Sequence, residues 1–121
     1  MQKTSIEHRV ARGATFMDRE RPDWENNVDL STLNLADNEQ CILGQRYGEY
    51  GIGTIVLGLS MRRQYRYGFI ATRAGGCAEY PDLTEAWAHE IIIRLQKNSL
   101  AKTFTKPQNA NACRALQPTL S

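Results

Sequence analysis

Residues 37–59 read DNEQCILGQRYGEYGIGTIVLGL, and this stretch decides the predicted fold class. Two apolar segments, 41–47 and 52–59, flank a glycine-rich turn. Gly48 offers a left-handed stop for a helix over the first segment. Within the second segment, we predict that residues 54–59 are also helical, with a buried strand as the alternative because residues 54–56 are β-branched. Both segments are expected to form the core of a mostly helical domain.

Helical spacing also marks the N-terminal part of the chain. Ile6, Val10, Ala14 and Met17 follow one another at spacings of four, four and three residues. These positions lie on one face of an α-helix. We therefore expect an amphipathic helix over residues 5–18 that buries this stripe.

The clearest helix signal is PDLTEAWAHEIIIRLQ, residues 81–96. Asp82 and Glu85 have the spacing of a capping box, with Thr84 as the alternative cap. The apolar stripe of this segment is broad, which predicts two neighbours to pack against. A further short helix is predicted over 60–68, between a serine cap and a glycine stop.

The predicted fold is mostly α, a compact bundle of three to five helices with a flexible C-terminal tail. The first apolar segment is expected to begin its helix after a cap at Asp37 or Asn38. The second segment is expected to bury Ile52, Val56 and Leu57. The other residues predicted to form the core are Val10, Met17, Trp24, Leu30, Leu33, Cys41, Ile42, Leu43, Tyr47, Ile55, Leu59, Phe69, Trp87, Ile91 and Leu95.

Length and composition indicate one folded unit. The 121 residues suffice for a core without a disulfide or a metal. An apolar fraction of 41% and a charged fraction of 23% are ordinary for a globular protein and argue against disorder throughout. Polar residues dominate after Lys97. We predict a single helical domain over 1–97 and a polar, flexible tail over 98–121.

Charge and hydropathy exclude several function classes. The net charge of +2 is too small to predict, from overall charge, a protein that binds nucleic acid. The longest apolar run, 52–59, is far shorter than the roughly 18 residues of a membrane span, and the start MQKTSIEHRV lacks the apolar centre of a signal peptide. The three cysteines form no CxxC pair, which suits a reducing cytoplasm. We expect a cytoplasmic protein that binds no membrane and needs no cofactor.

Catalytic and metal-binding patterns are weak. Zinc ligands usually come in close pairs, whereas Cys41, Cys77, Cys113, His8 and His89 are widely separated. Cysteine catalysis would require Cys77 or Cys41 near His89, with Asp82 or Glu85 to orient the imidazole. The alternative interpretation is that these cysteines are free thiols, with Cys41 buried as a small apolar residue. We predict no metal site, no catalytic residue and no enzymatic activity.

A glycine-rich phosphate loop is the next pattern to weigh, over residues 44–53. The P-loop needs lysine and then serine or threonine after its last glycine, and the dinucleotide fingerprint needs a third glycine that GIGTIV lacks. The glycines are therefore interpreted as residues for turns and for close packing of helices.

The segment SMRRQYRYGF carries the predicted contact residues. Its basic and aromatic side chains are Arg62, Arg63, Tyr65, Arg66 and Tyr67. Arginine and tyrosine are enriched at the centres of protein interfaces. Alternatively, this segment could be the second helix of a helix-turn-helix, in which the same arginines and Gln64 contact the bases of DNA. The basic and aromatic residues could also bind single-stranded nucleic acid. A third interpretation is a solvated arginine face with both tyrosines on the edge of the core.

Four stretches carry a resemblance to a known family. They are RGATFMDRERPDWENNVDLSTLNL, CILGQRYGEYGIGTIVLGL, YGF and YPDLTEAWAHEIIIRL, which together span about residues 11–95. The chain resembles a family of small proteins encoded by actinobacterial phages and related prophages. The resemblance implies a phage origin and a bacterial cytoplasm, and it supplies no activity. Where those proteins often read LGQLYG, this chain has Arg46 at the apolar position.

These observations predict a non-enzymatic phage accessory protein that binds a host or phage protein. The predicted contact surface is the basic and aromatic segment, residues 62–67. The alternative is a small DNA-binding regulator that uses the arginines of the same segment.

Overall fold

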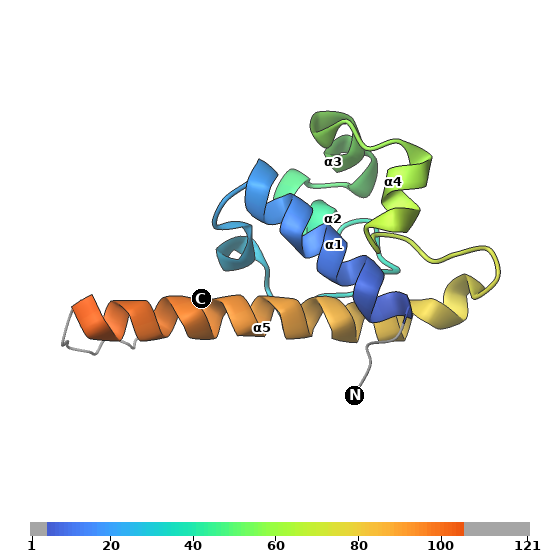
Figure 1. The fold of residues 1–121 in the computed structure, drawn as a ribbon. Coiled ribbons are helices and arrows are strands. Elements are labelled where there is room, and N and C mark those ends of the chain that lie inside the picture. Colours follow the sequence, from blue (N-terminus) through green and yellow to red (C-terminus); the bar gives the residue numbers. More distant parts are fainter. Residues whose placement is uncertain (1–4, 106–121) are drawn as a thin grey trace.

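Helices make up the regular secondary structure of the described chain (Figure 1). The structure is a computed structural model that describes the backbone of residues 5–105 and the side chains of residues 5–97. The α-helices are α1 (Ser5–Glu20), α2 (Ile42–Tyr47), α3 (Tyr50–Leu57), α4 (Met61–Arg66) and α5 (Tyr80–Thr105), and the 3-10 helices are η1 (Trp24–Asn27) and η2 (Gly76–Glu79). Residues 5–105 contain no strand. The mostly α-helical prediction is confirmed, and the alternative of a buried strand over residues 54–59 is wrong.

Helix α5 forms one side of the molecule, and α1 lies across it (Figure 1). The short helices α2, α3 and α4 lie on the side of α1 that is away from α5 in this view. Helix α5 begins at Tyr80, ahead of the predicted cap Asp82, because η2 leads directly into it. Pro81 is tolerated there because the first turn needs no N–H from it. The helix continues past Lys97, where we predicted the folded domain to end, and the predicted tail from 106 onward lies outside the described residues.

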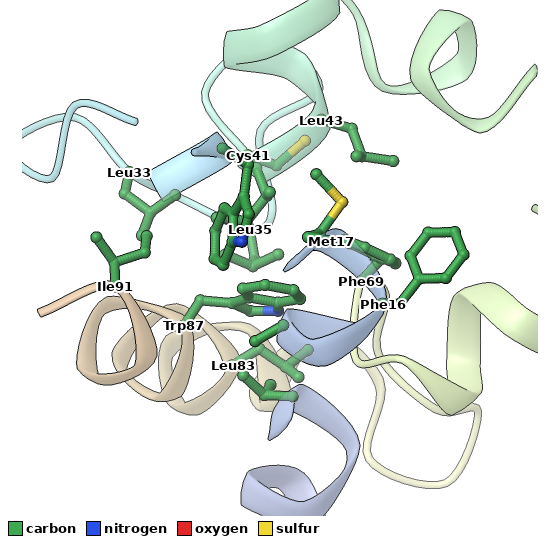
Figure 2. Close-up of a cluster of buried hydrophobic side chains, with 14 of the residues drawn as sticks. Phe16, Met17, Leu33, Leu35, Cys41, Leu43, Phe69, Leu83, Trp87 and Ile91 are labelled. Atoms are coloured by element: carbon green, nitrogen blue, oxygen red, sulfur yellow. The ribbon is translucent and has the colours of Figure 1, made fainter. Parts of the chain in front are cut away.

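Trp87 lies in the centre of the core (Figure 2), and the buried Trp24 ring packs against it. The Trp24 and Trp87 rings meet edge to face with centroids 5.6 Å apart, and Phe69 stacks on Trp87 at 5.1 Å. The Trp87 indole N–H donates to the carbonyl of Gly68 at 2.8 Å, so its one polar group is paired although the ring is fully buried. Burial of such large rings contributes strongly to folding. This cluster therefore holds α5 against the chain that leads out of α4.

Most of the predicted core is confirmed. Eleven of the predicted residues are buried, namely Val10, Met17, Trp24, Leu33, Cys41, Ile42, Leu43, Leu59, Phe69, Trp87 and Ile91. Leu30, Tyr47, Leu57 and Leu95 are half-buried against this cluster. The prediction is wrong for Ile52, Ile55 and Val56, which are exposed.

The cap of α2 differs from the one predicted. Cys41 is the N-cap, and its Sγ accepts the N–H of Gly44 at 3.2 Å. Asp37 instead stabilises the preceding turn, where its carboxylate accepts the N–H groups of Glu39 and Gln40. The predicted stop is confirmed, because Gly48 ends the helix with a φ of 90° that favours glycine.

A partly buried ion pair holds the loop that precedes α5. The Arg9 guanidinium, from α1, lies 3.3 Å from the Glu79 carboxylate and also donates to the carbonyls of Tyr65 and Ile70. Glu79 accepts two further hydrogen bonds from the backbone N–H and the hydroxyl of Thr72. Burial opposes ionisation of this carboxyl, but these bonds outweigh it and lower the pKa of Glu79. The chain from Thr72 to Glu79, just ahead of α5, is therefore tied to α1.

Candidate functional site

The predicted contact residues lie on and just after α4, and they divide into two groups. The arginine side chains at 62, 63 and 66 are exposed, and none of them forms a hydrogen bond or ion pair with another described side chain. Helix α4 has only six residues, and its N-cap is Ser60, whose hydroxyl accepts the N–H of Arg63 at 3.3 Å. The arginines are thus presented to solvent by a short, capped helix.

The two tyrosines of the segment are half-buried and connect α4 to α1. The Tyr67 ring stacks on Phe16 with centroids 4.8 Å apart and an interplanar angle of 25°. The backbone carbonyl of Tyr65 accepts the Nε–H of Arg9 at 2.9 Å. The structure therefore brings the arginines together on the surface and uses both tyrosine positions to attach their helix.

Sequence reasoning missed a second feature beside α4, the outward face of α3. Ile52, Ile55 and Val56 are exposed, Ile55 to 81%. Positions i, i+3 and i+4 lie on one side of a helix, so these three side chains form one apolar stripe. Met61, at the start of α4, is 60% exposed. We call Ile52, Ile55, Val56 and Met61, with Arg62 and Arg63, the α3–α4 face.

The inward side of α3 explains why its large side chains point outward. Gly53 is buried against α2, and a Cβ at this position would lie 2.8 Å from Leu43 Cβ and 2.9 Å from Tyr47 Cδ2. Only glycine permits this close approach. With the smallest residue facing its neighbour, an eight-residue helix must place its β-branched residues elsewhere. The glycine spacing in YGIGTIVL is the signal that could have indicated this orientation.

Two clefts open on the described surface. One, of about 370 Å³, lies between α1 and α4 and is lined by Ala11, Arg12, Thr15, Phe16, Arg19, Arg66 and Tyr67. We call it the α1–α4 groove. The other, of about 730 Å³, is lined by residues 25–31 and Leu95.

Comparison with known protein families, curated proteins and solved structures gave no match. The site is therefore interpreted from its own geometry.

The residues considered for catalysis are not assembled at either cleft. Cys77 is exposed in η2 and His89 is exposed on α5, and neither lines a cleft described above. Burial raises the pKa of the Cys41 thiol, which makes it a poor nucleophile. Cys113 lies outside the described residues. Among the described side chains, those of residues 5–97, no three histidine, cysteine or acidic groups lie close enough together to hold a metal ion.

The helix-turn-helix interpretation depends on which helix faces outward. Helices α2 and α3 do pack as a pair around the Gly48 turn. The outward side of α3, however, carries the apolar stripe, which offers no donor or acceptor to the edge of a base. Arg62, Arg63 and Arg66 on α4 are the groups left for contact with DNA. No helix in the described part of the chain is long and apolar enough to cross a membrane.

Proposed function

We propose that the chain is a non-enzymatic phage accessory protein that acts in the bacterial cytoplasm by binding a host or phage protein. The observation that carries the proposal is the exposure of the apolar stripe of α3. A helix that is apolar on every side is normally found in a protein interior. In this protein the partner would cover the exposed side of α3.

The energetics of the stripe support this interpretation. Full burial of one isoleucine or valine side chain contributes about 1.5–3 kcal/mol. Ile52 and Val56 are each 48% exposed and Ile55 81%, so much of this free energy is unused in the isolated chain. Contiguous exposed apolar surface on a small protein is typical of a binding site. The α3–α4 face therefore has a driving force for association.

The charges beside the stripe indicate the chemistry of the partner. Arg62 and Arg63 follow Met61 directly on α4, and their side chains have no acidic partner among the described residues. Interfaces commonly combine an apolar centre with a charged rim, and opposite charges across the rim orient the two proteins. The expected partner presents an apolar surface bordered by carboxylates.

Affinity capture from bacterial lysate with the full chain tests the proposal. A partner should be retained by the wild type, lost with Ile55→Glu and weakened by Arg63→Glu. Ile92→Glu is the matched control because Ile92 is 42% exposed on α5, away from the stripe. A protein retained equally by Ile55→Glu would contradict the proposal. So would a concentration-dependent dimer that Ile55→Glu abolishes, since the stripe would then be covered by a second copy.

Binding to DNA is the alternative that the three exposed arginines of α4 favour. Fluorescence anisotropy with random duplex DNA, at low and at physiological salt, separates the two functions. We expect no binding. Salt-steep binding that the combined change Arg62→Ala, Arg63→Ala and Arg66→Ala abolishes would replace the protein-binding proposal, because phosphate contacts have that dependence on salt.

A further inference from the structure

The α1–α4 groove combines positive charge with an aromatic wall. Arg12, Thr15, Phe16 and Arg19 lie at positions i, i+3, i+4 and i+7 of α1, so they share one face of that helix. The two arginines stand about 10 Å apart along the helix axis. Arg66 enters the groove from α4, on the opposite wall. Three guanidinium groups from two helices thus surround one depression.

Contacts within the protein leave these guanidinium groups largely available. The Nε–H of Arg12 donates to the backbone carbonyl of Arg66 at 3.3 Å, which orients Arg12 and leaves both of its Nη groups unused. Arg19 lies over the Phe16 ring at 5.9 Å and makes a long, exposed contact of 3.7 Å with Glu20. The Arg66 side chain has no hydrogen bond or ion pair with the described residues.

The local charge is not a consequence of a basic chain. The protein carries a net charge of only +2, yet no carboxylate is among the residues that line the groove. Like charges held together repel one another, and a concave surface concentrates their field. An anion in the groove would relieve this repulsion.

We propose that the α1–α4 groove binds a phosphate monoester whose organic group carries a planar ring. Three guanidinium groups that approach from different directions can each bond a separate oxygen of a phosphate, whereas a carboxylate offers only two oxygens. The groove volume of about 370 Å³ is much larger than a phosphate group, so the ligand has a body as well. Tyr67, stacked on Phe16, supplies an aromatic wall for a planar body. The Thr15 hydroxyl, on α1, is a further donor in the lining of the groove.

This site is independent of the proposed protein partner, because none of the apolar residues of the α3–α4 face lines the groove. Failure of one proposal therefore leaves the other intact. Two sources of the ligand share the same chemistry: a nucleoside monophosphate and a phosphorylated tyrosine side chain.

Titration of the ¹⁵N-labelled full chain with phenyl phosphate, followed through the arginine Nε–H resonances at about 0.15 M salt, tests the inference. We expect saturable shifts for Arg12, Arg19 and Arg66 and none for Arg62 or Arg63. Inorganic phosphate should bind at least about five-fold more weakly, and phenol should cause no shift. Non-saturating shifts, or equal shifts of all five arginines, would show that only general charge attraction is present and would overturn the site.

Two variants locate the binding. Arg66→Gln should weaken phenyl phosphate binding by about ten-fold or more, and it spares the backbone carbonyl that holds Arg12. Arg63→Gln is the matched control, since it removes the same charge from the same helix outside the groove, and it should change affinity less than about two-fold. Equal effects of the two variants would overturn the proposal.

Adenosine monophosphate and a phosphotyrosine amide then separate the sources. If either binds more tightly than phenyl phosphate and competes with it, the site is supported and that compound class is the source. If neither competes with phenyl phosphate, the proposed ligand class is wrong.

Discussion

Helices α5 and α3 are both rich in large apolar side chains, but the fold uses them in opposite ways. Leu83, Trp87 and Ile91 recur every four residues along α5 and are fully buried. The stripe of α3 has helical spacing too and faces solvent. Helix α5 is long and is crossed by α1, whereas α3 is short and packs mainly on α2. Apolar periodicity therefore shows that a helix needs a neighbour, and the neighbour of α3 is not within the described chain.

The largest expected effect is a loss of stability caused by a substitution on the buried face of α5. Trp87→Ala should lower the free energy of unfolding by about 3–5 kcal/mol, because it removes a fully buried indole from contact with Trp24 and Phe69. Ile55→Ala on α3 should change it by less than about 0.5 kcal/mol. Urea denaturation followed by circular dichroism measures both.

Trp87→Phe keeps this prediction testable if the alanine variant does not fold. It retains an aromatic ring and deprives the Gly68 carbonyl of its donor, at an expected cost of about 1–3 kcal/mol. Similar losses for Trp87→Phe and Ile55→Ala would mean that the two helices do not differ as described.

Two glycines on α3 sharpen the comparison within a single helix. Alanine is favoured over glycine in a helix by about 1 kcal/mol. A Cβ at Gly51 finds no atom closer than Glu49 Oε1 at 4.0 Å, so Gly51→Ala should stabilise the protein by about 0.5–1 kcal/mol. A Cβ at Gly53 collides with Leu43 and Tyr47, and this overpacking should outweigh the helix preference and give a net loss of about 1–2 kcal/mol. Thermal denaturation of both variants measures these changes in stability at the open position of Gly51 and at the position of Gly53, which faces α2. Stabilisation by Gly53→Ala would show that α3 does not pack closely on α2.

The smallest effect concerns the polar contact between α5 and α1. The Arg94 guanidinium, 2.8 Å from the Asp18 carboxylate, lowers the pKa of Asp18, assisted by the Trp24 indole N–H and opposed by partial burial. A carboxyl whose pKa falls on folding stabilises the protein above its unfolded pKa, near 3.9, and loses this contribution as the pH drops through the folded pKa. Because Asp18 is 45% exposed, its charge should contribute no more than about 1 kcal/mol.

Urea denaturation of the wild type and Asp18→Asn at pH 7, 5 and 3 measures this contribution. The difference should be largest at pH 7 and narrow toward pH 3. Asp23→Asn is a suitable control, since the Asp23 side chain has no hydrogen bond or ion pair with the described residues. A difference for Asp18→Asn that stays constant with pH would contradict the assigned ion pair.

Much of the fold could be predicted because its signals are local. Ser60 caps α4 and Gly48 ends α2 where the sequence indicated, and both act through hydrogen bonds to residues within a turn. The prediction of Asp37 as a helix cap is wrong. An aspartate carboxylate can accept N–H groups at the start of a helix or in a tight turn, and only the backbone conformation distinguishes the two.

The candidate sites were less predictable because they depend on residues that are distant in sequence. The exposed arginines of α4 were found from their own segment. Their neighbours across the α1–α4 groove are Arg12 and Arg19, which lie more than forty residues away in the sequence. No sequence pattern links these two arginines to those of α4. The ion pair of Arg9 with Glu79 likewise joins two residues that are 70 positions apart in the sequence.

The sequence by itself determined that this chain is helical, that Trp24, Trp87 and Ile91 are core residues, and that arginines cover α4. Periodicity and caps carry this information because they act over a few residues. Only the tertiary structure decided that α3 turns Gly53 inward and its isoleucines outward, and that three arginines meet in one groove. Burial depends on which distant surface is present to cover a side chain, and a helix with apolar residues on all sides does not encode that choice.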